Sequence, residues 1–265
     1  MEQQIKNQLQ QNKKLFIPFI TAGDPTPNAT IQLALSLQKI GASAIELGVP
    51  YSDPLADGPV IQKATKRALK NDMNIEKVMN LAGELKEKGV TIPIILFTYY
   101  NPVLQLGKER FFALTEQNQI DGLIVPDLPF EESDQLRSQC EDHNVTYISM
   151  VAPTSVERIS KISTNAKGFI YCVSSLGVTG VRNDFDPAIE EFLMKVKEHA
   201  KVPVAVGFGI SHSDHVKRMN QICDGVVVGS ALVNEIEKLE EKLLNHQTEK
   251  EAIIEFSQFA KSFVI

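Results

Sequence analysis

Cysteine is scarce in this sequence. The 265 residues include three cysteines, Cys140, Cys172 and Cys223, and these lie far apart along the chain. An odd number of widely spaced cysteines provides neither a disulfide framework nor the C-x-x-C spacing of a zinc site. The sequence therefore excludes the small disulfide-rich class of protein, and we expect the three thiols to be buried as small apolar groups.

Basic residues are also fewer than acidic residues. The chain has 27 Lys and Arg residues against 33 Asp and Glu residues, and its net charge at pH 7 is -6. A protein that binds nucleic acid non-specifically needs a basic surface to neutralise the phosphates. The composition therefore disfavours nucleic acid as a partner.

Long apolar runs and linkers are missing as well. No stretch approaches the roughly 18 apolar residues of a membrane span, and residues 1–14 are polar, without a signal-peptide core. We therefore expect a cytoplasmic chain. No Gly/Ser-rich or Pro-rich linker divides the sequence, so we expect a single domain over residues 1–265.

Short apolar, β-branched runs are abundant by contrast. Eight of them recur about every 30 residues, which is the size of one strand-plus-helix unit, and they cover residues 15–21, 43–47, 92–98, 122–125, 145–151, 168–173, 202–206 and 225–228. Segments of helical periodicity separate them, with Gly41 and Gly89 at expected helix ends. Several runs are almost continuously apolar, which is typical of parallel strands covered on both faces.

This pattern predicts an α/β protein, a (β/α)8 TIM barrel with additional N-terminal and C-terminal helices. Eight units in succession without a break favour the barrel over the alternative, a doubly wound open sheet. The extra helices are expected over residues 3–11 and 249–263.

Glu46 is the first candidate for catalysis, because catalytic groups in such barrels lie at the carboxyl ends of the strands. Period-two alternation places Glu46 on the opposite face of its strand from Ile45 and Leu47, and thus toward the barrel mouth. A carboxylate there is partly desolvated, which raises its pKa toward the range useful for proton transfer. The alternative is a strand-end Glu that pairs with a Lys or Arg.

Asp57 follows in the long loop after the same strand. It stands just before Gly58-Pro59 and a helical run, so local sequence favours the interpretation of Asp57 as a helix N-cap. A catalytic role is the alternative.

Glycines cluster after the last three strands, at residues 177–180, at Gly207 and Gly209, and at Gly229 before Ser230. Glycine lets backbone N–H groups approach an anion, and a helix N-terminus adds a favourable dipole. We predict a site for a phosphate monoester, with plain turns as the alternative. The polar segment 181–187 suits a lid. His212 and His215 have the i, i+3 spacing of a metal-binding pair, but they lie in the first turns of a predicted surface helix, so we expect no metal.

Five segments together resemble the tryptophan synthase α chain family. Residues 46–62 read ELGVPYSDPLADGPVIQ, and the resemblance extends over essentially the whole chain through FITAGDP at 19–25, TYYNP at 98–102, PDLP at 126–129 and GVTG at 177–180. One departure is Ser175, which stands where many family members carry arginine.

The resemblance implies a lyase that cleaves indole-3-glycerol phosphate to indole and glyceraldehyde 3-phosphate in tryptophan biosynthesis. By motif, Glu46 would protonate indole C3 and accept the proton of the glycerol hydroxyl, and Asp57 would accept the indole N–H. This role replaces the N-cap interpretation of Asp57.

The resemblance also assigns the binding residues. It places around the indole Phe19, Phe97, Tyr99, Asp127 and Tyr171. It places around the phosphate Gly180, Gly209, Gly229 and Ser230, with Thr179 in the lid.

A partner is implied too: the family works as an αββα heterotetramer in which indole passes to a β chain that condenses it with serine. That chain would dock on the loops at residues 53–59 and 101–102. Pyridoxal phosphate belongs to the β chain, and no cofactor is expected in this one. The competing hypotheses are a different phosphate-binding barrel enzyme and an inactive regulatory subunit. The retention of both Glu46 and Asp57 disfavours the regulatory subunit, and the lack of a catalytic lysine disfavours the other enzyme.

Overall fold

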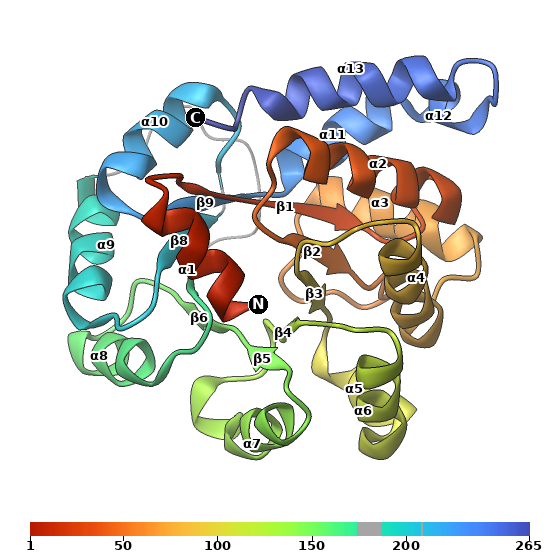
Figure 1. Cartoon of the computed structure of the whole chain (residues 1–265). Helices are drawn as coiled ribbons and strands as arrows, with labels where there is room; N and C mark the ends of the chain where they lie inside the picture. Colours follow the sequence, from red (N-terminus) through yellow and green to blue (C-terminus); the bar gives the residue numbers. More distant parts are fainter. Residues whose placement is uncertain (174–186, 208) are drawn as a thin grey trace.

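The computed structural model describes residues 1–173, 187–207 and 209–265. Strands and helices alternate along this part of the chain, and the strands form a barrel surrounded by helices (Figure 1). The strands are β1 (Leu15–Thr21), β2 (Ile45–Gly48), β3 (Ile94–Phe97), β4 (Gly122–Ile124), β5 (Thr146–Tyr147), β6 (Ser149–Val151), β7 (Ile170–Val173), β8 (Val204–Gly207) and β9 (Gly225–Val228).

Every pairing in the barrel is parallel, in the order β5-β4-β3-β2-β1-β9-β8-β7-β6. The two ends of this order, β5 and β6, are halves of one extended segment that is interrupted at Ile148. The first half pairs with β4 and the second with β7, so the barrel closes within this broken fifth strand.

The helices lie outside the strands in Figure 1, apart from α1, which crosses one end of the barrel. They are α1 (Glu2–Gln10), α2 (Pro27–Ile40), α3 (Pro59–Lys70), α4 (Ile75–Glu87), α5 (Tyr100–Leu106), α6 (Lys108–Gln117), α7 (Asp134–Asp142), α8 (Val156–Asn165), α9 (Pro187–His199), α10 (Ser213–Ile222), α11 (Ser230–Lys238), α12 (Glu240–Leu244) and α13 (Glu249–Lys261), with one 3-10 turn, η1 (Phe130–Glu132). None of the described helices is both long and apolar enough to cross a membrane.

The apolar side chains form two separate layers because strand residues alternate in direction. Ile45 and Leu47 of β2 belong to the large cluster between strands and helices. Ala44, just before β2, belongs to a smaller cluster inside the barrel, together with Ile17 and Ile95. Glu46 has the same parity as Ala44 and therefore shares the inner face.

Helix α1 closes the amino-terminal end of the barrel. Ile5 is 1% exposed and joins the inner cluster, with Met1 and Leu9 packed against it. The Gln4 side chain donates to the carbonyl of Thr91, just before β3, at 3.2 Å. With this end closed, the open end of the barrel is the carboxyl end of the strands.

The sequence predictions for the fold are confirmed in outline. All eight predicted runs are strands, and both extra helices are present as α1 and α13. Gly41 ends α2 with φ of 105°, and Gly89, with the same φ, follows the end of α4. The division of the fifth strand at Ile148 was not expected, because residues 145–151 contain no Gly or Pro that would mark a break.

Replacement of Ile5 by Ala tests the closing role of α1. The substitution leaves a cavity inside the barrel, so we expect it to lower the free energy of unfolding by about 2–5 kcal/mol. Urea denaturation followed by circular dichroism measures this change. Ile254→Ala on α13 is the control, because that side chain is 58% exposed. An Ile5→Ala protein as stable as the control would contradict the packing described for α1.

Candidate active site

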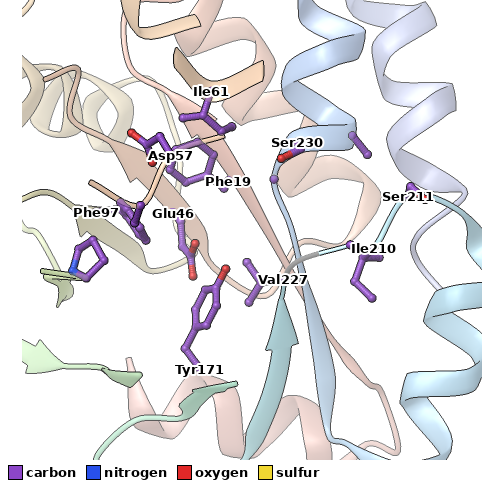
Figure 2. Close-up of a pocket in the computed structure, with 15 residues that line it drawn as sticks. Phe19, Glu46, Asp57, Ile61, Phe97, Tyr171, Ile210, Ser211, Val227 and Ser230 are labelled. Atoms are coloured by element: carbon purple, nitrogen blue, oxygen red, sulfur yellow. The ribbon is translucent and has the colours of Figure 1, made fainter. Parts of the chain in front are cut away.

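A cavity opens at the carboxyl end of the barrel strands. Figure 2 shows side chains from several strands pointing into it, together with the start of α11. Its described wall includes Phe19, Glu46, Phe97, Tyr171 and Val227 from the strands, and Asp57, Ile61 and Ser230 from the loops and helices that follow.

Glu46 lies at the inner end of this cavity and is 1% exposed. Neither carboxyl oxygen has a hydrogen-bond partner among the described residues. Burial disfavours the charged form, so the pKa of the Glu46 carboxyl is raised well above its ordinary value. Burial therefore favours the protonated form of Glu46, which is suited to act as an acid.

Tyr171 of β7 faces Glu46 across the barrel, with its hydroxyl directed toward the carboxyl in Figure 2. Burial and the nearby Glu46 both raise the pKa of the Tyr171 hydroxyl. Gly207 of β8 leaves the space for this ring, since a Cβ there would lie 2.4 Å from the Tyr171 hydroxyl oxygen. The ring thus forms a fixed wall beside the acid.

Asp57 also lines the cavity, just before α3. The N-cap of α3 is Gly58, and no side chain of the described residues caps that helix, so the N-cap interpretation of Asp57 is wrong. The Tyr99 hydroxyl instead donates a hydrogen bond to the Asp57 carboxylate and accepts one from the N–H of Ala56 at 3.0 Å. The side-chain amide of Gln62 donates to the Asp57 carbonyl at 2.8 Å.

The surroundings of Asp57 differ from those of Glu46, and they affect its pKa in a different way. Burial raises the pKa of Asp57 to about 6, and the hydrogen bond from Tyr99 opposes this rise. Asp57 is thus largely ionised at neutral pH, whereas burial favours the protonated form of Glu46. Two carboxyl groups in one cavity with separated pKa values are typical of paired acid and base roles.

Two aromatic rings supply the apolar wall next to the carboxyl groups. Phe19 and Phe97 meet edge to face, with ring centroids 5.4 Å apart and planes at 81°. A Cβ at Gly48 would lie 2.5 Å from the Phe19 ring, so glycine at the end of β2 permits this arrangement. The rings offer a surface on which a planar apolar group can pack.

Tyr99 and Asp127 are not among the described residues that line the cavity. Tyr99 is 2% exposed and acts on the cavity through Asp57. The Asp127 carboxylate accepts hydrogen bonds from the Tyr100 N–H at 2.9 and 3.2 Å, at the start of α5. Asp127 therefore holds the loop after β3 that carries Tyr99.

The far side of the cavity has the features of an anion site. Gly209 has φ of 81°, with open space where a side chain would stand. Gly229 and Ser230 line the cavity at the start of α11, whose first-turn N–H groups have no acceptor within the helix. The described lining residues include no Lys or Arg. The predicted Thr179 and Gly180 lie outside the described residues.

The loops at the rim are joined to one another. The Asn101 side chain donates to the Tyr51 hydroxyl at 3.0 Å, and the Tyr51 and Tyr99 rings lie 5.4 Å apart. The loop that carries Asp57 is thereby connected to the start of α5. Leu55 in this loop is 78% exposed, which is unusual for a large apolar side chain.

Several cavity residues were not predicted from the sequence. Val227 has the inward parity of β9, so strand alternation could have identified it. Ile61 and Ser211 gave no comparable signal, because their approach depends on where α3 and the turn after β8 pack. His212 and His215 lie with ring centroids 5.6 Å apart, and the described residues contain no group of three or more potential ligands placed to hold a metal ion.

Comparison with known proteins gives a consistent result. A family model described as tryptophan synthase alpha chain matches residues 5–263. The tryptophan synthase alpha chain of Bacillus licheniformis is 64% identical over 254 residues, covering 96% of this chain and 95% of that protein. That of Bacillus subtilis strain 168 is 62% identical over 258 residues, covering 97% of each.

Solved structures agree with these sequence matches. Tryptophan synthase subunit alpha from Legionella pneumophila superposes with a TM-score of 0.86 at 34% identity, covering 98% of this chain and 95% of that one. A chain of the tryptophan synthase α2β2 complex from Pyrococcus furiosus superposes with a TM-score of 0.83 at 34% identity, covering 95% of this chain and 98% of that one.

Replacement of Tyr99 by Phe tests the contact between Tyr99 and Asp57. Because the hydroxyl lowers the pKa of Asp57, its loss should raise that pKa above about 6. A pH titration of 13C-labelled Asp carboxyl groups by NMR measures the shift. Tyr51→Phe is the control, since the Tyr51 hydroxyl bonds to Asn101. An unchanged Asp57 titration in Tyr99→Phe would show that the hydroxyl does not act on this carboxylate.

Proposed function

The chain belongs to the tryptophan synthase alpha chain family, and from this premise we propose that the cavity between Glu46, Asp57 and the start of α11 is its active site. The chain is a lyase subunit that cleaves indole-3-glycerol phosphate in tryptophan biosynthesis. The observation that carries the assignment is the pair of carboxyl groups with different surroundings that face one cavity.

The substrate fits this cavity in one direction. The indole ring packs between the Phe19–Phe97 pair and the Glu46 side, with its N–H directed to the ionised Asp57 carboxylate. The phosphate lies at the start of α11, where Gly229, Ser230 and the helix dipole supply hydrogen bonds and a favourable potential. The indole end of the substrate thus meets aromatic rings and a carboxylate, and the phosphate end meets hydrogen-bond donors and a positive dipole end.

Cleavage requires the indole ring to accept the electrons of the breaking carbon–carbon bond. Glu46 donates its proton to indole C3, and the ring becomes a cation that Asp57 stabilises by accepting the indole N–H. The bond from C3 to the glycerol carbon then breaks, its electrons return to the ring, and the glycerol hydroxyl becomes the aldehyde. Glu46, now ionised, takes the hydroxyl proton and is restored.

The protein surroundings prepare both groups for these steps. The burial of Glu46 favours its protonated form before the reaction. The hydrogen bond from Tyr99 favours the ionised form of Asp57. Proton transfer by side chains of this chain suffices for each step, so we propose that it uses no cofactor of its own. Pyridoxal phosphate is assigned to the β chain, where it would serve the condensation of indole with serine.

The partner of this chain is the β chain, as in the α2β2 complex of its Pyrococcus relative. We propose that the β chain docks over the rim loops at residues 53–59 and 101–102. The exposure of Leu55 and the bond between Asn101 and Tyr51 support this location. Docking there would act directly on the loop that carries Asp57.

The experiment that tests the assignment is the release of indole from indole-3-glycerol phosphate by the purified chain, with and without a β chain. We expect release in both cases and a faster rate with the partner. No indole under either condition would overturn the proposed function.

Replacement of Glu46 by Gln removes the proton donor and keeps the side-chain volume. We expect kcat to fall by about 10²–10⁴-fold, equivalent to about 3–5 kcal/mol of barrier, with KM little changed. Asp57→Asn should also lower kcat, since the amide cannot balance the positive charge on the ring. Steady-state kinetics measure both. A Glu46→Gln protein with wild-type kcat would exclude Glu46 as the acid.

The two carboxyl groups also predict the pH profile. Asp57 acts in its ionised form, so kcat/KM should fall as the pH drops through about 6. Glu46 acts in its protonated form, so activity should fall again as the pH rises through its elevated pKa. Measurement of kcat/KM against pH should give a bell-shaped curve. A profile that stays flat below pH 6 would contradict the role of Asp57.

A further inference from the structure

Arg67, in the last turn of α3, joins three elements by ion pairs. Its Nε and Nη2 donate to the two carboxylate oxygens of Asp24 at 2.6 and 2.9 Å. The side chain of Asp24 is 1% exposed and that of Arg67 12%. A buried bidentate pair fixes direction as well as distance, so it orients α3 relative to the turn after β1.

The same guanidinium faces the helices that follow β9. Arg67 Nη1 lies 3.5 Å from Glu237 of α11, and its Nε lies 3.9 Å from Glu240 of α12. Lys63, one turn earlier on α3, lies 3.2 Å from Glu237. Arg67 is therefore held between the turn after β1 and the far end of α11.

Helices α3 and α11 reach the cavity at different points. Helix α3 begins two residues after Asp57, and its Ile61 lines the cavity. Helix α11 begins at Ser230. Between the cavity and Arg67 they pack through Ala64 and Val233, in a cluster that includes Phe19. A shift of α3 along α11 would thus change the separation between Asp57 and the start of α11.

The turn that carries Asp24 is itself connected to the strand of Glu46. The Ala22 N–H donates to the carbonyl of Gly48 at 2.9 Å, at the end of β2. The Asn71 side chain, just after α3, donates to the carbonyls of Gly23 and Pro25 at 2.9 and 2.7 Å. The contacts around Arg67 therefore extend to β2, the strand that carries Glu46.

We propose that Arg67 is a positioning residue for the reaction: its ion pairs with Asp24 and Glu237 set the distance between Asp57 and the phosphate-binding start of α11. This inference rests on the proposed function, because it takes those two places as the ends of the substrate site. If α3 moved, a substrate held by its phosphate would no longer have its indole N–H at the correct distance from Asp57. A misplacement of about 1 Å can cost about 10²-fold in rate.

The test compares three variants. Arg67→Gln removes the ion pairs but leaves a buried Asp24 charge, which also destabilises the fold. The double variant Asp24→Asn with Arg67→Gln removes that buried charge and still lacks the ion pairs of Arg67. Lys86→Gln is the matched control, since Lys86 is also largely buried and lies 2.8 Å from Asp121, at the amino-terminal end of the barrel.

Two measurements separate positioning from folding: kcat and KM for indole release, and the inhibition constant of glycerol 3-phosphate, which occupies the phosphate end alone. For Arg67→Gln and for the double variant we expect kcat/KM to fall 10- to 100-fold with the inhibition constant changed less than 2-fold. Urea denaturation should show the double variant more stable than Arg67→Gln. Lys86→Gln should lose stability and keep wild-type kinetics.

The outcomes are distinct. A double variant with wild-type kcat/KM would overturn the inference, as would a parallel loss of glycerol 3-phosphate affinity in both Arg67 variants. A wild-type chain that releases no indole would overturn the proposed function itself.

Discussion

The desolvation of Glu46 is the constraint on which the rest of the site depends. Its carboxyl is buried on the inner face of β2 without a hydrogen-bond partner among the described residues. Such a group is stable only when it is neutral, because an isolated charge in an apolar environment costs far more free energy than protonation. The barrel supplies that environment through closely packed parallel strands, which hold Tyr171 and Phe97 around the acid. The same apolar walls that exclude water from the acid also form the surface for an aromatic ligand.

The site separates the roles of its charged groups by their surroundings. Asp57 lies on a loop, accepts a hydrogen bond from Tyr99 and has a pKa raised to about 6, whereas Glu46 lies on a strand where burial favours its protonated form. In the proposed function, the anionic end of the ligand is left to backbone N–H groups around Gly209 and Gly229. This division explains how a chain with a net charge of -6 can bind a phosphate ester. Local dipoles would decide such binding, because surface charges farther from the site than a Debye length are largely screened by salt.

Much of this arrangement could be predicted from local pattern. Period-two alternation placed Glu46 on the inner face, and the spacing of apolar runs identified the strands. Asp57 shows where local pattern fails as a predictor. An Asp before Gly-Pro has the local sequence of an N-cap, yet the Asp57 carboxylate accepts a hydrogen bond from Tyr99, 42 residues later. The Asp24–Arg67 pair was not foreseen either, since the two residues meet only after α3 packs against the first turn. Patterns within one element predict which way a side chain points, but a partner from another element depends on tertiary packing.

The barrel wall consists of two arcs that meet at the interruption of the fifth strand at Ile148 and, on the opposite side, at the pairing of β1 with β9. One runs from β5 to β1 and carries Glu46, with Asp57 in the loop after β2; the other runs from β9 to β6 and carries Tyr171, with the start of α11 after β9. The arcs are joined by the pairing of β1 with β9 on one side and by the broken strand on the other. A ligand that contacts the carboxylates and the helix terminus at once is therefore a cross-link between the arcs. Part of its binding free energy becomes stability of the closed barrel, so the enzyme is more firmly assembled when its substrate is present than when the cavity is empty.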